Sequence, residues 1–96
     1  MKYSFHPEAE AELNSAVEFY EAHEKGLGYE FSLEIYAAVE RAAAYPDAWP
    51  LFDGDIRRCL VGRFPYGILY AVGADEISVV AVMHLHREPD YWKKRV

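Results

Sequence analysis

The sequence contains a single cysteine and no long apolar run. Cys59 therefore has no partner for a disulfide within the chain, and no apolar stretch approaches the roughly 20 residues that span a membrane. The first residues, Met1 to Pro7, lack the long apolar segment of a secretory signal. These absences favour a cytoplasmic protein with no membrane partner. Glycine-rich phosphate loops and zinc-finger spacings are also missing, so neither a cofactor nor a metal is predicted.

The charge is distributed unevenly along the chain. The formal net charge is −6, and residues 1–48 carry ten acids and three bases, whereas residues 49–96 carry six acids and seven bases. An acidic protein is poorly suited to broad nucleic-acid binding, which requires many phosphate contacts. The more basic second half could still bind an acidic protein segment. A length of 96 residues with 52% hydrophobic residues is consistent with one domain, residues 1–96, with a modest core.

Apolar residues recur at helical spacing in two stretches of the first half. Pro7 is well placed to begin a helix that ends near His23, and a second helix is predicted from Gly28 to Ala44. A short turn between them predicts an antiparallel helical hairpin. Four glutamates of the first helix lie mainly off its apolar stripe, and we interpret them as a solvated face: Glu8, Glu12, Glu18 and Glu21.

Four stretches are rich in β-branched and aromatic residues and predict strands: residues 2–5, 56–61, 64–72 and 77–85. The chain is therefore predicted to be an α+β fold in the order β-α-α-β-β-β, with the helical hairpin packed on a small antiparallel sheet. The stretch 47–55 is predicted to be a loop. Near the end of the chain, Pro89 is placed to open a short helix, and Trp92 is expected to pack on the sheet.

The last predicted strand alternates between two faces. One face would carry Ile77, Val79, Ala81, Met83 and Leu85, and the other Ser78, Val80, Val82, His84 and His86. Because the second set includes two valines, the middle of this strand is predicted to be covered on both sides. The polar residues begin only where the strand ends.

The end of the chain supplies the candidate functional residues. His84 and His86 share one strand face and could form a metal clamp, an acid/base pair or a plain polar surface. A metal would need further ligands, and the spacing of His6, His23 and Cys59 places none of them nearby. Tyr91 could stack on a nucleotide base or anchor the terminus.

The basic residues of the strands have their own expected positions. Arg57 and Arg58 are neighbours in a strand and should point to opposite faces of the sheet. Arg63 is expected in an exposed turn.

Several short groups of residues occur, each once, in a characteristic order along nearly the whole chain. They are Phe5-His6-Pro7-Glu8-Ala9, Tyr45-Pro46 with Trp49-Pro50, Arg57-Arg58, Phe64-Pro65-Tyr66, and His84-Leu85-His86-Arg87 with Pro89, Tyr91, Trp92 and Arg95. In their joint order and spacing they resemble the RelE/ParE superfamily, the toxins of bacterial type II toxin–antitoxin pairs.

The resemblance implies a protein partner. Superfamily members are kept inactive by a cognate antitoxin whose C-terminal segment wraps the toxin, in a hetero-oligomeric complex. Such segments are often acidic, which the basic second half of this chain would suit. The two helices and the outer strand are the expected docking surfaces.

The superfamily has two activities. RelE-like members cleave mRNA in the ribosomal A site, whereas ParE-like members bind DNA gyrase and block it without being hydrolases. RelE-like nucleases carry an arginine directly after the tyrosine that Tyr66 matches, and here that residue is Gly67, which supplies no charge. This substitution and the acidic net charge favour the ParE-like branch.

The two activities assign different roles to the same end of the chain. In the ParE-like reading, the target-binding residues are Arg58, Arg63, Arg87, Tyr91, Trp92 and Arg95. In the RelE-like reading, the catalytic residues are His84, His86, Arg87 and Tyr91. A third reading is a degenerate member that binds its antitoxin without being toxic.

Overall fold

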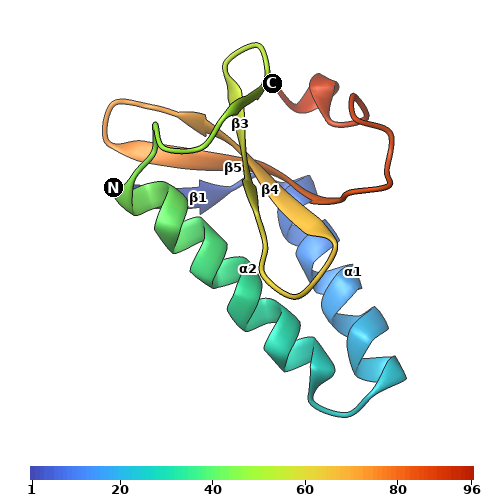
Figure 1. The fold of residues 1–96 in the computed structure, drawn as a ribbon. Helices are drawn as coiled ribbons and strands as arrows, with labels where there is room; N and C mark the ends of the chain where they lie inside the picture. The colour runs from blue at the N-terminus through green and yellow to red at the C-terminus, as the bar shows by residue number, and fades with distance from the viewer.

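The computed structural model describes residues 1–96 and contains two long helices and one five-stranded sheet (Figure 1). In chain order the elements are β1 (Lys2–Phe5), α1 (Pro7–His23), α2 (Leu27–Ala44), β2 (Leu51–Asp53), β3 (Ile56–Leu60), β4 (Tyr66–Val72), β5 (Glu76–His84) and the 3-10 helix η1 (Lys93–Arg95). The predicted α+β class and element order are confirmed. Neither long helix is apolar over a length sufficient to cross a lipid bilayer.

The sheet has the strand order β1-β5-β4-β3-β2. Strands β2 to β5 pair antiparallel in succession, whereas β1 pairs parallel to β5, so the sheet is antiparallel except at one edge. The other edge is formed by β2, which lies in the stretch predicted as a loop. That prediction was wrong because the short run Leu51–Asp53 is stabilised by pairing with β3 and not by its own composition.

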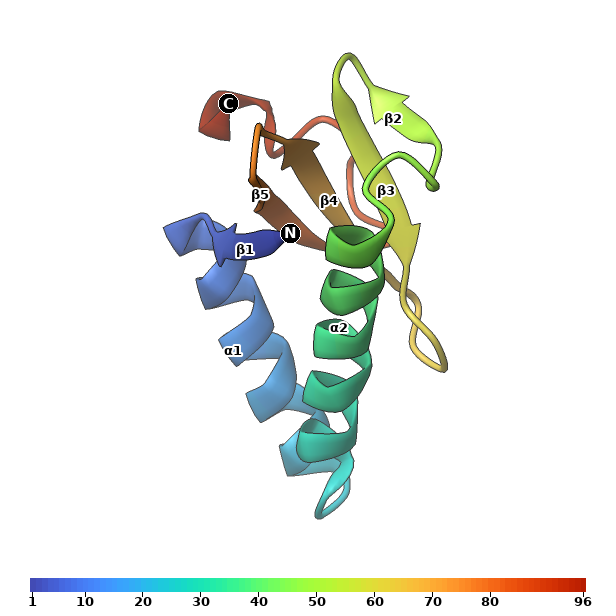
Figure 2. The same ribbon diagram turned by 90° about the vertical axis from the view of Figure 1, so that its left-hand side faces the viewer.

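The helical hairpin covers one face of the sheet (Figure 2). α1 begins where predicted, because the ring nitrogen Nδ1 of His6 accepts a hydrogen bond of 3.1 Å from the backbone N–H of Glu8 and Pro7 occupies the first turn. A cluster of sixteen buried residues fills the space between helices and sheet. Within it, the hydroxyl of Tyr70 donates a 2.8 Å hydrogen bond to the carbonyl of Pro46, just beyond the end of α2.

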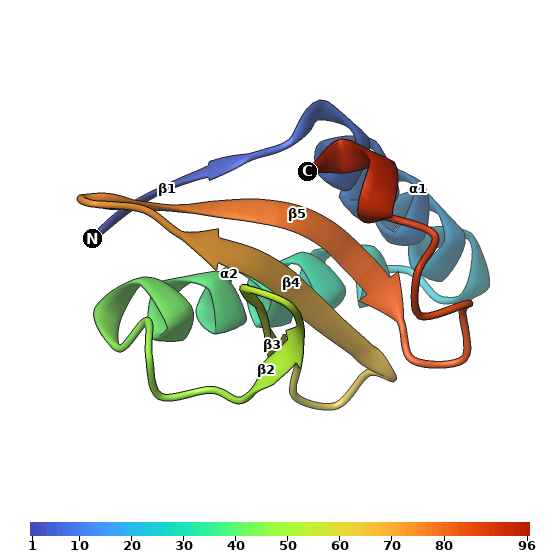
Figure 3. The same cartoon turned by 90° about the horizontal axis from the view of Figure 1, so that it is seen from above.

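The opposite face is covered in part by the C-terminal segment, which we define as residues 85–96 and which returns from the end of β5 towards the start of α1 (Figure 3). As predicted, Trp92 packs on the sheet: it is 2% exposed and belongs to a second cluster of six buried residues, Ile56, Leu69, Val80, Ala81, Met83 and Trp92. The predicted short terminal helix is present only at its end: Pro89 to Trp92 form turns, and the helix is limited to residues 93–95. Within three residues the segment must place Trp92 on the sheet and Arg95 against α1, and a 3-10 turn, Lys93–Arg95, does this.

A β-bulge in β5 changes the predicted faces of this strand. Leu69 pairs with Ala81 and Tyr70 with Val79, which leaves Val80 as an extra residue without a partner on β4. Val80 and Ala81 therefore lie on the same face, in the Trp92 cluster, and Val82 lies on the helix face with Val79. The predicted alternation holds up to Val80 and is wrong beyond it. The prediction that both sides are covered is confirmed.

The two helices approach closely at Gly28, and this contact generates a test. A Cβ atom at Gly28 would lie 2.5 Å from the carbonyl oxygen of Val17 and 2.9 Å from Cβ of Glu21. Gly28→Ala is therefore expected to lower the free energy of unfolding by about 1–3 kcal/mol, although alanine is the better helix former. Urea unfolding measures this change.

The matched control is Gly62→Ala, because there the new Cβ would meet only the end of the flexible Glu34 side chain, at 3.0 Å. We expect a change below about 1 kcal/mol. Equal effects at the two glycines would contradict the close helix contact.

Candidate functional site

A cleft of about 460 Å³ opens between α1, the end of β5 and the C-terminal segment. Its lining combines small, aromatic and acidic residues of α1 with basic, aromatic and aliphatic residues from the other elements. The lining residues are Glu8, Ala11, Glu12, Ser15, Ala16, Phe19, Tyr66, Val82, His84, Arg87 and Arg95. The cleft therefore brings together His84 and Arg87, which the sequence analysis singled out, with acids from the first helix.

Glu12 holds the wall of this cleft together. Its carboxylate accepts two hydrogen bonds from the guanidinium of Arg95, at 2.8 and 3.2 Å, and Nη1 of Arg87 lies 3.6 Å from Oε2. The side chains of Glu12 and Arg95 are only 14% and 9% exposed, so this pair is shielded from water. The hydrogen bond to Glu12 raises the pKa of Arg95, which keeps the guanidinium charged.

The same two side chains complete the edge of the sheet. β1 pairs with β5 only from Glu76 to Val79, and beyond this point that edge of β5 has no neighbouring strand. There the backbone N–H of Val82 donates to Oε1 of Glu12 at 3.0 Å, and Arg95 donates to the carbonyl of Val80 at 3.1 Å. A side chain from each end of the molecule thus replaces the hydrogen bonds of a missing strand.

Tyr91 lies between two arginines. Its ring centroid is 3.8 Å from Cζ of Arg87 and 5.0 Å from Cζ of Arg95. The hydroxyl is buried and has no hydrogen-bond partner of normal geometry. Burial first, and then the nearby Glu12 carboxylate, raise the pKa of Tyr91. The hydroxyl therefore stays protonated and enclosed, and the ring anchors the C-terminal segment.

His84 and His86 lie side by side, with ring centroids 5.2 Å apart. The backbone N–H of His86 donates to Nδ1 of His84 at 3.1 Å, so the neutral His84 ring carries its proton on Nε2. The ring of His84 also contacts Tyr66, at a centroid distance of 5.1 Å. Because of the bulge, His84 faces the helix side of the sheet and lines the cleft.

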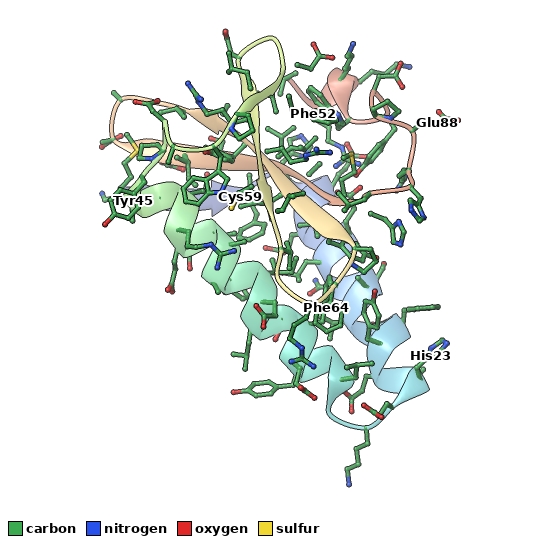
Figure 4. All side chains as sticks on the ribbon, in the orientation of Figure 1. His23, Tyr45, Phe52, Cys59, Phe64 and Glu88 are labelled. Carbon is green, nitrogen blue, oxygen red and sulfur yellow. The ribbon has the colours of Figure 1, made fainter.

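No further side chain is placed to bind a metal ion together with His84 and His86. The structure contains no group of three or more His, Cys, Asp or Glu side chains placed to share a metal ion. Figure 4 shows His23 at the tip of the helical hairpin, well away from Glu88 in the C-terminal segment, and Cys59 between the sheet and α2. Cys59 is fully buried and its pKa is raised by that burial, which suits a small core residue.

Comparisons with known proteins agree with this architecture. The family described as "ParE toxin of type II toxin-antitoxin system, parDE" matches residues 3–89. The chain belongs to the ParE toxin family. A solved structure described as the chromosomal ParDE TA system from P. aeruginosa is similar in fold, with a TM-score of 0.64 and 15% identity over 90% of this chain and 97% of that one. A comparison with curated proteins finds no match.

Gly67 is the position at which a RelE-like nuclease would carry an arginine, and in this ParE-family chain it serves packing. A Cβ atom at Gly67 would lie 3.1 Å from both Cγ and Cδ of Arg58. The stem of Arg58 crosses Gly67, and its guanidinium stacks on Phe52 at 4.7 Å. Arg57 and Arg58 point to opposite faces, as predicted: Arg57 pairs with Asp47 at 3.7 Å and donates to the carbonyl of Trp49.

The remaining predicted target-binding residues differ in exposure. Arg63 lies in the β3–β4 turn, where it is 54% exposed and pairs with Glu30 at 2.9 Å. Arg87 is 53% exposed. Trp92 and Arg95 are almost completely buried, so both hold the C-terminal segment in place and offer little surface to a target.

The interpretation of the first-helix glutamates as a solvated face was wrong for Glu12, which is the centre of the site. Glu21 is exposed, as predicted, and in addition accepts hydrogen bonds from the backbone N–H groups of Gly26 and Gly28, at 2.9 and 3.0 Å. A signal for Glu12 was present in the sequence. It follows Ala9 by three residues and precedes Ala16 by four, and both alanines are buried, so Glu12 borders the apolar stripe.

Replacing the charge of Glu12 tests its role. Glu12→Gln keeps the size of the side chain but leaves Arg95 with only the exposed Glu8 carboxylate, 3.6 Å away, as a counter-charge, and we expect the free energy of unfolding to fall by about 2–3 kcal/mol. The control is Glu18→Gln, an exposed glutamate outside all ion pairs, with an expected change within about 0.5 kcal/mol. Urea unfolding measures the free energy of unfolding of both variants. Equally small changes for the two would show that Glu12 does not stabilise the fold.

The two anchored tyrosines provide a second test. Tyr91→Phe removes a buried hydroxyl that has no partner, so the free energy of unfolding should stay constant or rise by up to about 1 kcal/mol. Tyr70→Phe removes the hydrogen bond to Pro46 and should lower it by about 1 kcal/mol. Thermal and urea unfolding would measure both; a larger loss for Tyr91→Phe would mean that its hydroxyl bonds Glu12.

Proposed function

We propose that this chain is the toxin of a type II toxin–antitoxin module, that a cognate antitoxin neutralises it in a hetero-oligomer, and that it inhibits DNA gyrase by binding. In this proposal residues 1–96 act as one toxin domain. The observation that carries it is the family match over residues 3–89, the ParE toxins. The activity of the ParE-like branch requires a binding surface and no catalytic group.

The chemistry of the cleft supports a binding protein over a nuclease. Arg87 and Tyr91 are two of the residues that a RelE-like nuclease would use. Here Arg87 is paired with Glu12 and stacked on Tyr91, and the hydroxyl of Tyr91 is buried. A phosphate would have to compete with Glu12 for Arg87, and the hydroxyl of Tyr91 has no access to a substrate proton. The arginine expected after Tyr66 is replaced by Gly67, which packs under Arg58.

The proposed target surface consists of basic groups near this end of the molecule. Arg63 and Arg87 are exposed and Arg58 is partly buried, and each lies against an aromatic ring that fixes its position. Arginines held in this way lose little conformational freedom when they bind. Trp92 and Arg95 contribute by anchoring the segment that carries Arg87.

A second candidate function rests on His84. The histidine, with its Nε2 proton, lines the same cleft as Tyr66 and Arg87. These groups are of the types that position a phosphate and exchange a proton in ribonucleases. This observation favours a ribosome-dependent mRNA endonuclease over other enzymes as the alternative. The third reading, a non-toxic antitoxin-binding protein, requires none of these groups.

The proposal is tested by inducing the chain alone in a bacterial host. We expect a loss of colony formation with filamentous cells, and inhibition of supercoiling when the purified chain is added to DNA gyrase. His84→Ala should leave both effects unchanged within about twofold, because a binding inhibitor does not require an acid/base group.

The alternatives predict different results. A nuclease would arrest protein synthesis first, without filaments, and His84→Ala would slow mRNA cleavage by at least about tenfold. Unimpaired growth, with no effect on gyrase, would leave the non-toxic antitoxin-binding reading.

A further inference from the structure

The turn between β3 and β4, residues 61–65, contains the one residue of the chain other than glycine that has a positive φ angle. Arg63 has a φ of 68°, in a region that residues with a Cβ atom rarely adopt. The backbone N–H of Phe64 donates a 2.8 Å hydrogen bond to the carbonyl of Gly62. Such a bond, closed around a central residue of positive φ, forms the rare and strained type of γ-turn.

The glycine beside Arg63 does not take the strained position. Glycine reaches positive φ without steric cost, but the φ of Gly62 is not positive. A Cβ atom at Gly62 would lie 3.0 Å from Oε1 of Glu34, so this glycine lies close to α2. The backbone of the turn does not require an arginine at position 63, and glycine or asparagine would adopt the same conformation with less strain.

The rest of the turn is fixed by packing and by a neighbouring strand end. The ring of Phe64 lies 5.0 Å from that of Tyr20 and 5.1 Å from that of Phe31, both edge-to-face. Figure 4 shows Phe64 at the end of the β3–β4 hairpin, beside the two helices. The carbonyl of Pro65 accepts a 2.9 Å hydrogen bond from the N–H of Leu85, where the C-terminal segment begins. The turn therefore presents its arginine from a rigid base.

The contacts that the Arg63 side chain makes within the fold are weak. Its Nη1 lies 2.9 Å from Oε1 of Glu30, but the two side chains are 54% and 44% exposed, and exposed ion pairs contribute little to stability. Its Cζ lies 5.5 Å from the centre of the Phe64 ring, near the outer limit for a cation–π contact. These contacts orient the guanidinium but do not offset a strained backbone. Strain without structural gain indicates a role in recognition.

We propose that Arg63 contacts DNA gyrase directly and that its guanidinium binds a carboxylate of the gyrase protein. This inference rests on the proposed function and goes beyond it, because it assigns an acidic chemistry to the part of the target that meets the β3–β4 turn. In the free chain Glu30 holds the guanidinium, so the target carboxylate replaces an exposed partner. Arginine suits this exchange because its planar group binds carboxylates through two parallel hydrogen bonds.

The charges around the turn favour a carboxylate of the protein over a phosphate of its DNA. The turn lies against two acids of α2, Glu30 and Glu34, and the chain has a net charge of −6. DNA carries negative charge along its whole length and would be repelled by these acids. A single carboxylate on a folded protein requires only Arg63. A DNA phosphate is therefore the alternative that the experiment must exclude.

The test replaces Arg63 by residues that relieve the strain. Arg63→Gly and, independently, Arg63→Asn are expected to raise the concentration of the chain that half-inhibits supercoiling by DNA gyrase by about tenfold or more. The urea midpoint of unfolding should stay equal or rise for both variants, because glycine and asparagine accept a positive φ. Unchanged inhibition by either variant would overturn the proposal, since a loss with glycine alone reflects a more flexible turn. A lower midpoint for both would overturn the argument from strain.

Two further variants separate the contact from net charge and from the internal ion pair. Lys25→Gly makes the same change in net charge in the exposed α1–α2 turn and should leave inhibition within about twofold. Glu30→Gln removes the internal partner of Arg63 and should leave inhibition equal or strengthen it by up to about threefold, because the guanidinium is already free. Weaker inhibition by Glu30→Gln would mean that Arg63 acts by holding the turn against α2, and would contradict the proposal.

Binding in the absence of DNA identifies the chemistry of the contact. Calorimetric titration of purified DNA gyrase should show an affinity about tenfold or more lower for Arg63→Gly than for the unaltered chain. Added salt should weaken binding of the unaltered chain more than binding of the variant. Equal affinities without DNA, together with weaker inhibition by the variant, would mean that Arg63 meets a DNA phosphate, and the carboxylate assignment would then be wrong.

The same assays separate this inference from the proposed function. If the unaltered chain inhibits gyrase and the Arg63 variants inhibit it equally, the assignment of Arg63 fails and the gyrase proposal stands. If the unaltered chain neither binds nor inhibits gyrase, the gyrase proposal fails and the Arg63 contact fails with it.

Discussion

The ion pair between Glu12 and Arg95 joins three parts of the molecule that are distant in sequence: the first helix, the open edge of β5 and the last turn of the chain. A strand edge with unpaired backbone groups is both costly when buried and prone to pair with other chains. Here β1 covers only the first half of β5. The two charged side chains complete the rest, and this leaves a cleft where a further strand would otherwise lie.

The position of the C-terminal segment follows from this pair and from Trp92. Arg95 fixes the segment to α1, Trp92 fixes it to the sheet, and Tyr91 lies between Arg95 and Arg87. Two residues of the possible catalytic set, Arg87 and Tyr91, thus contact each other and the Glu12–Arg95 pair. Because Arg87 is paired with Glu12 and stacked on Tyr91, its guanidinium would have to break these contacts to stabilise a reacting phosphate. The same contacts hold Arg87 rigidly at the surface, which suits recognition of a protein.

Charge balance within the fold has a similar consequence for partners. Sequence totals suggest a basic second half, but folding brings most of its bases onto acids of the helices and of the β2 region. Which charges remain free for a partner is determined by which of them pair within the fold. The formal charge of a sequence segment therefore does not predict the charge of its binding partner until the ion pairs within the fold are known.

Local patterns were sufficient for most of the architecture. The helical hairpin, four of the five strands and the burial of Trp92 follow from periodicity, breakers and residue size, because each depends on neighbours within a few positions. The family follows from the joint order of several short motifs. The tertiary structure decided the rest: the pairing of β2, the bulge that turns His84 into the cleft, and the roles of Glu12 and Gly67. Glu12 is 83 residues from Arg95 in sequence, and a pattern read along the chain carries no information about such a contact. Whether a charged residue is solvated or structural depends on what the fold places opposite it.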